Sequence, residues 1–351
     1  MHSKNPRAAA LSHRACDGAL PKRMLRQEII EHFGKAHVVQ FPNFRALCNA
    51  LKALSIQTAV QIWRGPNKGR ATICDLGCGK GGDLGKWMPH RPKKLVGIDG
   101  SAKCIAEAVA RHSTLVSNGR GSIAAEFLDM DLCDPSIRLP FDDNTIDIVS
   151  SHFFLQFAAE SEGTFHRILS ESSRVLSPGG VLIAVLPDGD RIFSLLERGD
   201  ARSQRFGHFA LSTCEGKQFQ RNQNAFNCAY QFSLGEEACT EFLVPSQLLS
   251  TALRLHGLET TSEMDNVFSK PAHQFFVSAA ATSSVAANIM KGQNCSHLDW
   301  LSLGLFRVFI ARKTDPSQTR PRAEQSTNSK KEKVGRQETK RGTKRKIRSE
   351  S

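Results

Sequence analysis

The chain has 351 residues, of which 40% are hydrophobic and 23% charged, and its formal net charge at pH 7 is +13. This length and composition predict a globular protein with a sizeable core, and they argue against a membrane protein, because no apolar run reaches the roughly 18 residues that a span needs. Ten cysteines occur without a Cys-x-x-Cys pair or a Cys/His set at zinc spacing. We therefore expect no disulfides and no bound metal, and we place the protein in a reducing compartment.

Composition divides the chain into three regions. Residues 1–24 are rich in Ala, Arg, His and Lys without a clear period, which predicts a mobile basic leader. Residues 25–313 are predicted to form the folded domain. Residues 314–351 are poor in apolar side chains and dense in Lys and Arg, which predicts a disordered basic tail. A nuclear address, RNA binding and plain solubility are three open readings of that tail.

The predicted elements of the first half follow an alternating pattern. Apolar residues between Phe44 and Trp63 recur three and four apart, which predicts an amphipathic helix. After it, short apolar runs alternate with helical stretches, as in a parallel, doubly wound sheet. In chain order we expect a strand at 71–77, a strand at 94–100, a helix at 102–111, a strand at 124–131, a strand at 145–154, a helix at 162–176, and a strand after the Pro-Gly-Gly turn at 178–180.

The second half is less regular. Residues 228–234 and 306–313 predict two more strands that extend or close the sheet, and residues 244–256 predict a helix. Residues 192–240 and 260–300 fit no simple repeat and are interpreted as insertions on one face. The predicted fold class is α/β, with a doubly wound, mostly parallel sheet and insertions.

A glycine-dense loop, "DLGCGKGG", follows the first strand of the sheet. Glycines at Gly77 and Gly79 permit a tight turn whose backbone comes close to a ligand. Asp99 ends the next strand, where a carboxylate can bind both hydroxyls of a ribose. The two features together predict a nucleoside site. Their spacing resembles class I S-adenosylmethionine-dependent methyltransferases and differs from the G-x-G-x-x-G of NAD enzymes.

Lysines beside this loop suggest what else the site binds. Lys80 and Lys86 flank the predicted cofactor cleft and indicate a polyanionic substrate, although a solvated helix face would give the same charge pattern.

The longer stretch "DLGCGKGGDLGKW" resembles the signature of eukaryotic mRNA cap guanine-N7 methyltransferases. Further matches follow in the same order, among them "VGID", "DIVSSHFFLQF", "EFLVP" and "FRVFIARK", and the resemblance spans residues 41–313. It implies a seven-stranded, Rossmann-like sheet of the class I methyltransferase type.

The resemblance also implies which residues bind the cofactor, S-adenosylmethionine. Lys52 matches a lysine at its methionine end, with the stretch 41–45 as a rival alignment, and Asp99 and Asp131 match residues on the ribose and adenine sides. His152 stands where the family has glutamine, either beside adenine or as a core histidine, and Phe157 stands where it has tyrosine. The implied cofactor-binding residues are Lys52, Gly77, Gly79, Asp99, Asp131, His152 and Phe157.

A second set is implied to bind the cap. Lys80, Lys86 and Arg111 match residues that face the cap and its triphosphate, and Glu241 matches a glutamate at the N1 and N2 edge of guanine. Phe306 stands where the family has a cap-stacking tyrosine. The implied cap-binding residues are Asn49, Lys80, Lys86, Arg111, Gln156, Glu241 and Phe306, and Asp190 and Arg191 could line the same cleft.

The function implied is methyl transfer from S-adenosylmethionine to N7 of the guanine of the 5′ GpppN cap of mRNA. No catalytic residue and no metal are expected, since positioning and electrostatics suffice. We expect a nuclear monomer without membrane attachment, with capped mRNA as substrate and other capping enzymes or the transcription machinery as further partners. Two alternatives stay open: a methyltransferase acting on a small molecule, and a non-catalytic RNA-binding relative.

Overall fold

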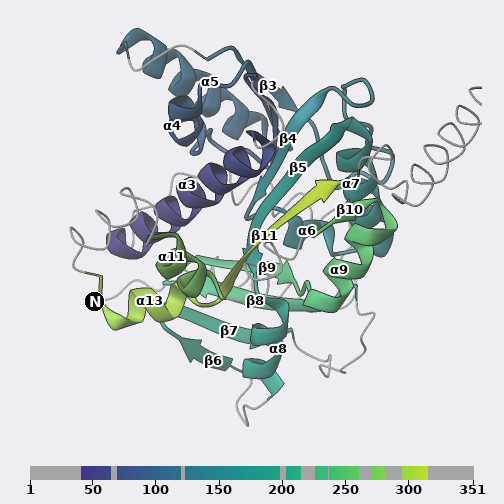
Figure 1. Ribbon diagram of the computed structural model, residues 1–351. Coiled ribbons are helices and arrows are strands. Elements are labelled where there is room, and N and C mark those ends of the chain that lie inside the picture. The colour runs from purple at the N-terminus through teal and green to yellow at the C-terminus, as the bar shows by residue number, and fades with distance from the viewer. Residues whose placement is uncertain are drawn as a thin grey trace, which may run out of the picture. The chain divides into compact units, whose positions relative to one another are not determined.

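The computed structural model describes residues 41–64, 69–119, 123–197, 203–214, 226–235, 237–260, 271–280 and 295–314 (Figure 1). The predicted leader and almost all of the predicted tail lie outside these ranges, so the domain boundaries stay predictions. The chain divides into two units, Met1–Lys313 and Thr314–Ser351, and all the helices and strands below belong to the first.

A seven-stranded sheet forms the centre of the first unit, in the order β10-β11-β5-β4-β1-β2-β3. The pairs from β5 to β3 are parallel, and β11 is antiparallel to both of its neighbours. This confirms the predicted doubly wound, mostly parallel sheet. The strands are β1 (Thr72–Leu76), β2 (Lys94–Asp99), β3 (Ala125–Asp129), β4 (Ile146–His152), β5 (Leu176–Pro187), β10 (Leu258–Glu259) and β11 (Phe306–Lys313).

Both faces of the sheet are buried. Along β5, Leu182 and Ala184 belong to one apolar cluster, whereas Val181 and Ile183 belong to another. Successive side chains of a strand point to opposite faces, so each cluster lies on its own side of the sheet. This explains why the central strands read as continuous apolar runs.

Helices cover the two faces. The long helix α3 packs across β5 and β4, while α6, α7 and α9 contribute apolar residues to the cluster on the opposite face (Figure 1). Ser101 and Ser161 cap the N-termini of α5 and α7 by accepting from the backbone three residues later. The described helices are α3 (Pro42–Arg64), α4 (Leu84–Trp87), the 3₁₀ turn η1 (Met88–His90), α5 (Ala102–Ser117), α6 (Leu155–Ala158), α7 (Glu162–Val175), α8 (Gly189–Glu197), α9 (Ser246–Leu255), α11 (Ala272–Ala280) and α13 (His297–Leu303).

A second, four-stranded antiparallel sheet was not predicted. It consists of β6 (Ser203–Phe206), β7 (Phe209–Thr213), β8 (Ala229–Leu234) and β9 (Glu237–Phe242), in that order. The prediction that residues 228–234 extend the main sheet was therefore wrong, whereas residues 306–313 do join it as β11. An alternating pattern identifies a strand but not its partner, because pairing depends on where the chain returns.

The second sheet packs beside the N-terminal half of α3. Phe44 of α3 meets Phe209 of β7 edge to face, with ring centroids 5.2 Å apart, and both belong to the same apolar cluster. Phe306 joins this cluster from the start of β11, opposite Pro187 at the end of β5. The second sheet thus stands at the edge where the parallel strands end.

The described helices include none that combines the length and the apolar character needed to cross a bilayer.

Candidate functional site

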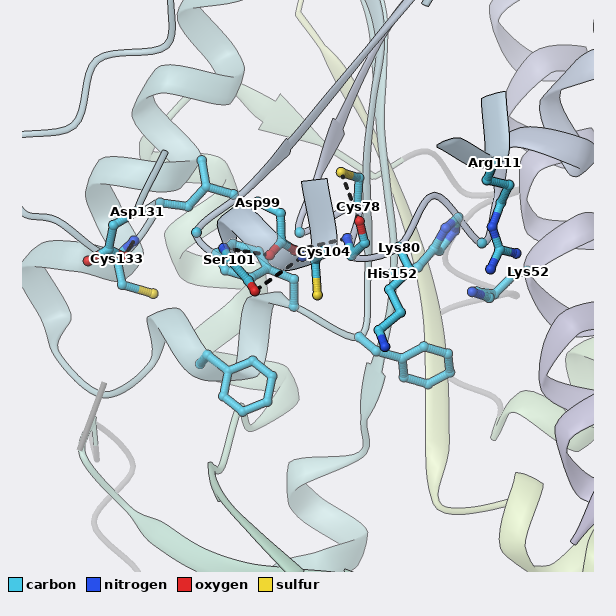
Figure 2. Close-up of a pocket in the computed structure, with 18 of the residues that line it drawn as sticks. Lys52, Cys78, Lys80, Asp99, Ser101, Cys104, Arg111, Asp131, Cys133 and His152 are labelled. Carbon is cyan, nitrogen blue, oxygen red and sulfur yellow. Dashed lines mark hydrogen bonds between the residues drawn. The ribbon is translucent and has the colours of Figure 1, made fainter. Parts of the chain in front are cut away.

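A cavity of about 500 Å³ opens at the carboxyl ends of β1, β2 and β4, the edge where parallel sheets bind ligands (Figure 2). Asp131 and Cys133 lie at one end of the view, Lys52 and Arg111 at the other, and Asp99 between them. Most of the residues predicted to bind ligand line this cavity. They are Lys52, Gly77, Gly79, Lys80, Asp99, Arg111, Asp131, His152 and Phe157.

The glycine loop takes the tight turn that the sequence predicted. The φ angles of Gly77 and Gly79 are 69° and 51°, in the left-handed region that favours glycine. A Cβ on Gly77 would lie 2.5 Å from the Cβ of Phe154, so a larger residue does not fit there. Gly79 has open space in front of it and lines the cavity. The loop therefore brings its backbone to the cavity wall.

Asp99 is fixed at the end of β2 by two backbone amides. The N–H of Gly79 donates to one carboxylate oxygen at 2.9 Å, and the N–H of Ser101 donates to the other at 3.0 Å. Burial raises the pKa of Asp99 despite these bonds. Each oxygen keeps a lone pair that can accept from a ribose hydroxyl. Asp131, which was predicted to lie on the adenine side, accepts from the N–H of Cys133 at 3.0 Å.

Asp83, to which the sequence assigned no role, organises the opposite end. Its Oδ1 pairs with Lys52 at 2.6 Å and with Lys86 at 2.9 Å, and its Oδ2 bonds His152 Nδ1 at 3.0 Å. The other ring nitrogen of His152 bonds Ser55 of α3 at 3.1 Å. These contacts fix Lys52 and His152, which come from different elements. Since the partners are 31 and 69 residues away in the sequence, only the fold brings them together.

Charge compensation separates Asp83 from its neighbour Asp75. Burial opposes ionisation of Asp83, but Lys52, His152 and Lys86 outweigh it and hold its pKa well below the usual value. Asp75 lies buried at the end of β1, where burial and the charge of Asp83 raise its pKa to about 6, despite a hydrogen bond from Ser150. Asp83, which is paired with cations, therefore loses its proton at much lower pH than Asp75 does.

Cationic side chains line the cavity next to this network. Lys52 and Arg45 lie seven residues apart on α3, so they share one face, and Lys80 and Arg111 reach the cavity from the glycine loop and α5. Lys80 also pairs with Glu107 at 3.1 Å. Arg45 falls in the rival stretch 41–45, and its spacing from Lys52 was the signal that could have placed both. The result is a wall suited to a phosphate chain.

The residues predicted to hold guanine lie buried beside the cavity rather than on its wall. Glu241 of β9 is 7% exposed and Gln156 of α6 is 2% exposed. The hydroxyl of Tyr230, the chain's only tyrosine, donates to Glu241 at 2.6 Å. Phe306 packs edge to face on Phe153, a cavity residue, with ring centroids 5.1 Å apart. Sequence reasoning missed Tyr230, which only the register of β8 on β9 reveals.

Four other predicted residues lie away from the cavity wall. Lys86 bonds Asp83 and the carbonyl of Gly82, and Asn49 is exposed on α3. Asp190 pairs with Arg307 and accepts from Ser246, and Arg191 lies over the ring of Phe206 at 4.9 Å. Their roles in ligand binding stay predictions.

Two of the thiols at the cavity, those of Cys78 and Cys104, are poor nucleophiles, because burial raises the pKa of each. In the ranges that the structure describes, His, Cys, Asp and Glu side chains do not gather in groups that could hold a metal ion. The chemistry that these residues offer is binding and orientation.

Comparison with known proteins gives a family match over most of the chain. The model of the mRNA (guanine-N(7))-methyltransferase domain matches residues 27–337. The mRNA cap guanine-N(7) methyltransferase of Caenorhabditis briggsae is 28% identical over 61% of this chain and 58% of its own length. The mRNA cap guanine-N(7) methyltransferase 1 of Arabidopsis thaliana is 25% identical over 77% of this chain and 76% of its own. The match thus spans between about half and three quarters of these relatives.

Solved structures superpose more loosely. A putative S-adenosylmethionine-dependent methyltransferase from Listeria monocytogenes aligns with a TM-score of 0.44 at 16% identity, covering 76% of this chain and 99% of that one.

Proposed function

From the premise that this chain belongs to the mRNA (guanine-N(7))-methyltransferase family, we propose that it methylates N7 of the cap guanine of mRNA, with S-adenosylmethionine as methyl donor. The observation that carries this proposal is the cavity at the strand ends, which combines a glycine loop, the anchored carboxylate of Asp99 and a wall of cations.

The residues present fit the cofactor. When bound, S-adenosylmethionine would supply a methyl group activated by its sulfonium centre. Asp99 would accept from the ribose hydroxyls of the cofactor. Gly77 and Gly79, which carry no side chain, would let the cofactor come close to the backbone of the loop. Lys52, held in place by its ion pair with Asp83, would bind the carboxylate of the methionine end of the cofactor.

Aromatic residues at and beside the cavity would orient the guanine base. Guanine N7 carries a lone pair in the neutral base, so the protein need not remove a proton. Phe157 at the cavity wall and the Phe153–Phe306 pair beside it offer ring faces and edges for stacking. Holding N7 in line with the methyl group would be the source of catalysis.

The cationic wall would hold the triphosphate bridge of the cap. Arg45 and Arg111 form no ion pair with a described residue, so their guanidinium groups are available to phosphate oxygens. Arginine donates in a planar fork that fits these oxygens. This also favours capped RNA over a small neutral substrate.

The test is methyl transfer from labelled S-adenosylmethionine to GpppA-capped RNA, with ApppA-capped and uncapped triphosphate RNA as controls. We expect signal on the guanosine cap only. Cofactor binding without transfer to any of the three RNAs would overturn the proposal and favour a small-molecule substrate. Loss of cofactor binding altogether would favour a non-catalytic RNA-binding protein.

A matched pair of variants tests the cofactor site itself. Asp99→Ala should abolish cofactor binding, because it removes the acceptor for the ribose. Asp129→Ala changes an exposed carboxylate at the end of the neighbouring strand and should leave binding unchanged. Equal losses in both variants would contradict the role of Asp99.

We extend the proposal to place and partners. The basic stretch 330–348 and the reaction on mRNA support a nuclear location and contact with other capping enzymes or the transcription machinery, and we propose that the protein acts as a monomer. A fusion to a fluorescent protein that stays outside the nucleus, with or without residues 330–348, would contradict the location.

A further inference from the structure

Tyr230 and Glu241 face each other across the β8–β9 hairpin. They are directly paired in the antiparallel register, and the Tyr230 hydroxyl donates to Glu241 Oε2 at 2.6 Å. Tyr230 is fully buried and Glu241 is 7% exposed. A buried phenol and a buried carboxylate each need a hydrogen-bond partner, and here each is the partner of the other. The bond commits one oxygen of Glu241 and fixes the plane of its carboxylate.

The second oxygen of Glu241 is only weakly engaged. Gln156 Nε2 donates to the carbonyl of Phe153 at 3.1 Å and reaches Glu241 Oε1 only at 3.5 Å, the long limit for a hydrogen bond. Gln156 Oε1 is buried and has no hydrogen-bond partner among the described residues. Two acceptor oxygens from neighbouring side chains, Glu241 Oε1 and Gln156 Oε1, therefore have capacity for further hydrogen bonds.

This site is connected to the cavity. Gln156 precedes Phe157 and bonds Phe153, and both phenylalanines line the cavity wall. Tyr230 contacts Phe232 edge to face at 6.4 Å, and Phe232 contacts Phe306 at 6.3 Å, so one aromatic cluster runs from the hairpin to the cavity. A base that stacks on Phe153 or Phe157 at the cavity wall would reach Glu241 and Gln156 in place of their weak mutual contact.

We propose that Tyr230 is a positioning residue for base recognition: its hydroxyl fixes Glu241 through Oε2, so that Oε1 and Gln156 Oε1 accept from the N1–H and N2–H₂ donors of guanine. The inference rests on the proposed function. Guanine presents these two donors side by side, whereas adenine presents an acceptor at N1 and has no amino group at C2. A carboxylate free to rotate would still attract guanine but would discriminate less well, because a site built on hydrogen bonds selects only when its acceptors are held in place.

The test removes only the hydroxyl. Tyr230→Phe keeps the ring, and the variant is compared with wild type on RNA capped with guanosine and with inosine, which lacks the 2-amino group. We expect kcat/KM on the guanosine cap to fall about tenfold or more and the guanosine-to-inosine preference to shrink, with cofactor affinity unchanged. Phe232→Leu, which disturbs the same aromatic cluster without touching Glu241, should keep the preference.

Each outcome decides the inference. A Tyr230→Phe protein with the wild-type guanosine-to-inosine preference would overturn it, and so would a Phe232→Leu protein that loses the preference equally. If Tyr230→Phe loses cofactor binding as well, its effect is one of folding and the inference falls. Wild-type protein that neither methylates nor binds a guanosine cap would overturn the proposed function itself, a result distinct from all of these.

Discussion

Two buried carboxylates beside the candidate site, Asp83 and Glu241, have opposite surroundings. Asp83 faces the cationic groups of Lys52 and Lys86, which with His152 hold its pKa well below the usual value. Among the described residues, Glu241 accepts from the neutral donors of Tyr230 and Gln156, and burial raises its pKa to about 7. The comparison teaches that similar burial goes with opposite pKa shifts when one carboxylate is paired with cations and the other with dipoles.

The largest expected effect comes from breaking the charged centre. Asp83→Asn should lower the free energy of unfolding by about 3 kcal/mol or more, because Lys52 and Lys86 would be left largely buried without a counter-charge. Urea denaturation measures the change. Asp143→Asn breaks the ion pair between Asp143 and Arg174. The Asp143 side chain is 62% exposed, so this change should have little effect on the free energy of unfolding. A similar loss in both variants would show that burial is not the cause.

Neutralising Glu241 should act in the opposite direction. At pH 8, Glu241→Gln should raise the free energy of unfolding by up to about 3 kcal/mol, since it removes a buried charge whose pKa moves from 4.5 to about 7 on folding. The same change should abolish selective methylation of the guanosine cap, because an amide nitrogen replaces an acceptor. A variant less stable than wild type at pH 8 would contradict this account.

Dependence on pH sharpens the contrast. The stability of wild type relative to Glu241→Gln should fall as pH rises from about 4.5 to about 7 and then level off, because the folded protein holds this proton longer than the unfolded chain. The stability that Asp83 gives wild type relative to Asp83→Asn should instead be lost in acid, below the usual pKa of 3.8, because the folded protein keeps Asp83 ionised to lower pH than the unfolded chain does. Calorimetry of the three proteins across pH 3–8 checks both signs.

The smallest expected effect concerns Lys86. Lys86→Met removes one of the two lysines on Asp83 and should weaken cofactor binding by no more than about tenfold, because Lys52 keeps its own ion pair. Lys94→Met, which breaks an exposed pair with Glu126, should leave binding unchanged. Isothermal titration with the cofactor measures both. Complete loss of binding in Lys86→Met would mean that Lys86 itself contacts a ligand.

The contrast also separates what the sequence could predict from what it could not. The glycine loop, Asp99 and the parallel strands were predictable, because their signals are local runs whose strand ends must meet at one edge of the sheet. Charge pattern predicted Lys80 beside the cofactor cleft, and the family resemblance added Arg111. Neither could show that Lys86 bonds Asp83, since a pattern gives the sign of a charge and not its partner.

The contacts of Asp83 and Glu241 could not be predicted from the sequence for the same reason. Asp83 joins residues from α3 and β4, and Tyr230 reaches Glu241 through the register of a hairpin whose sheet the sequence did not reveal. Such contacts depend on tertiary pairing, which the period of a single strand does not encode.

The insertion of β11 between β10 and β5 has a consequence for synthesis. β5 ends at Pro187, and its antiparallel neighbour begins only at Phe306. At roughly 5–20 residues per second, the ribosome needs on the order of ten seconds to make the intervening chain, and during that delay β5 has no partner on this side. An unpaired strand edge invites pairing with another chain. A nascent chain stalled in this interval would therefore present β5 as an unpaired edge strand. We expect such a chain to be prone to aggregation and to need chaperones.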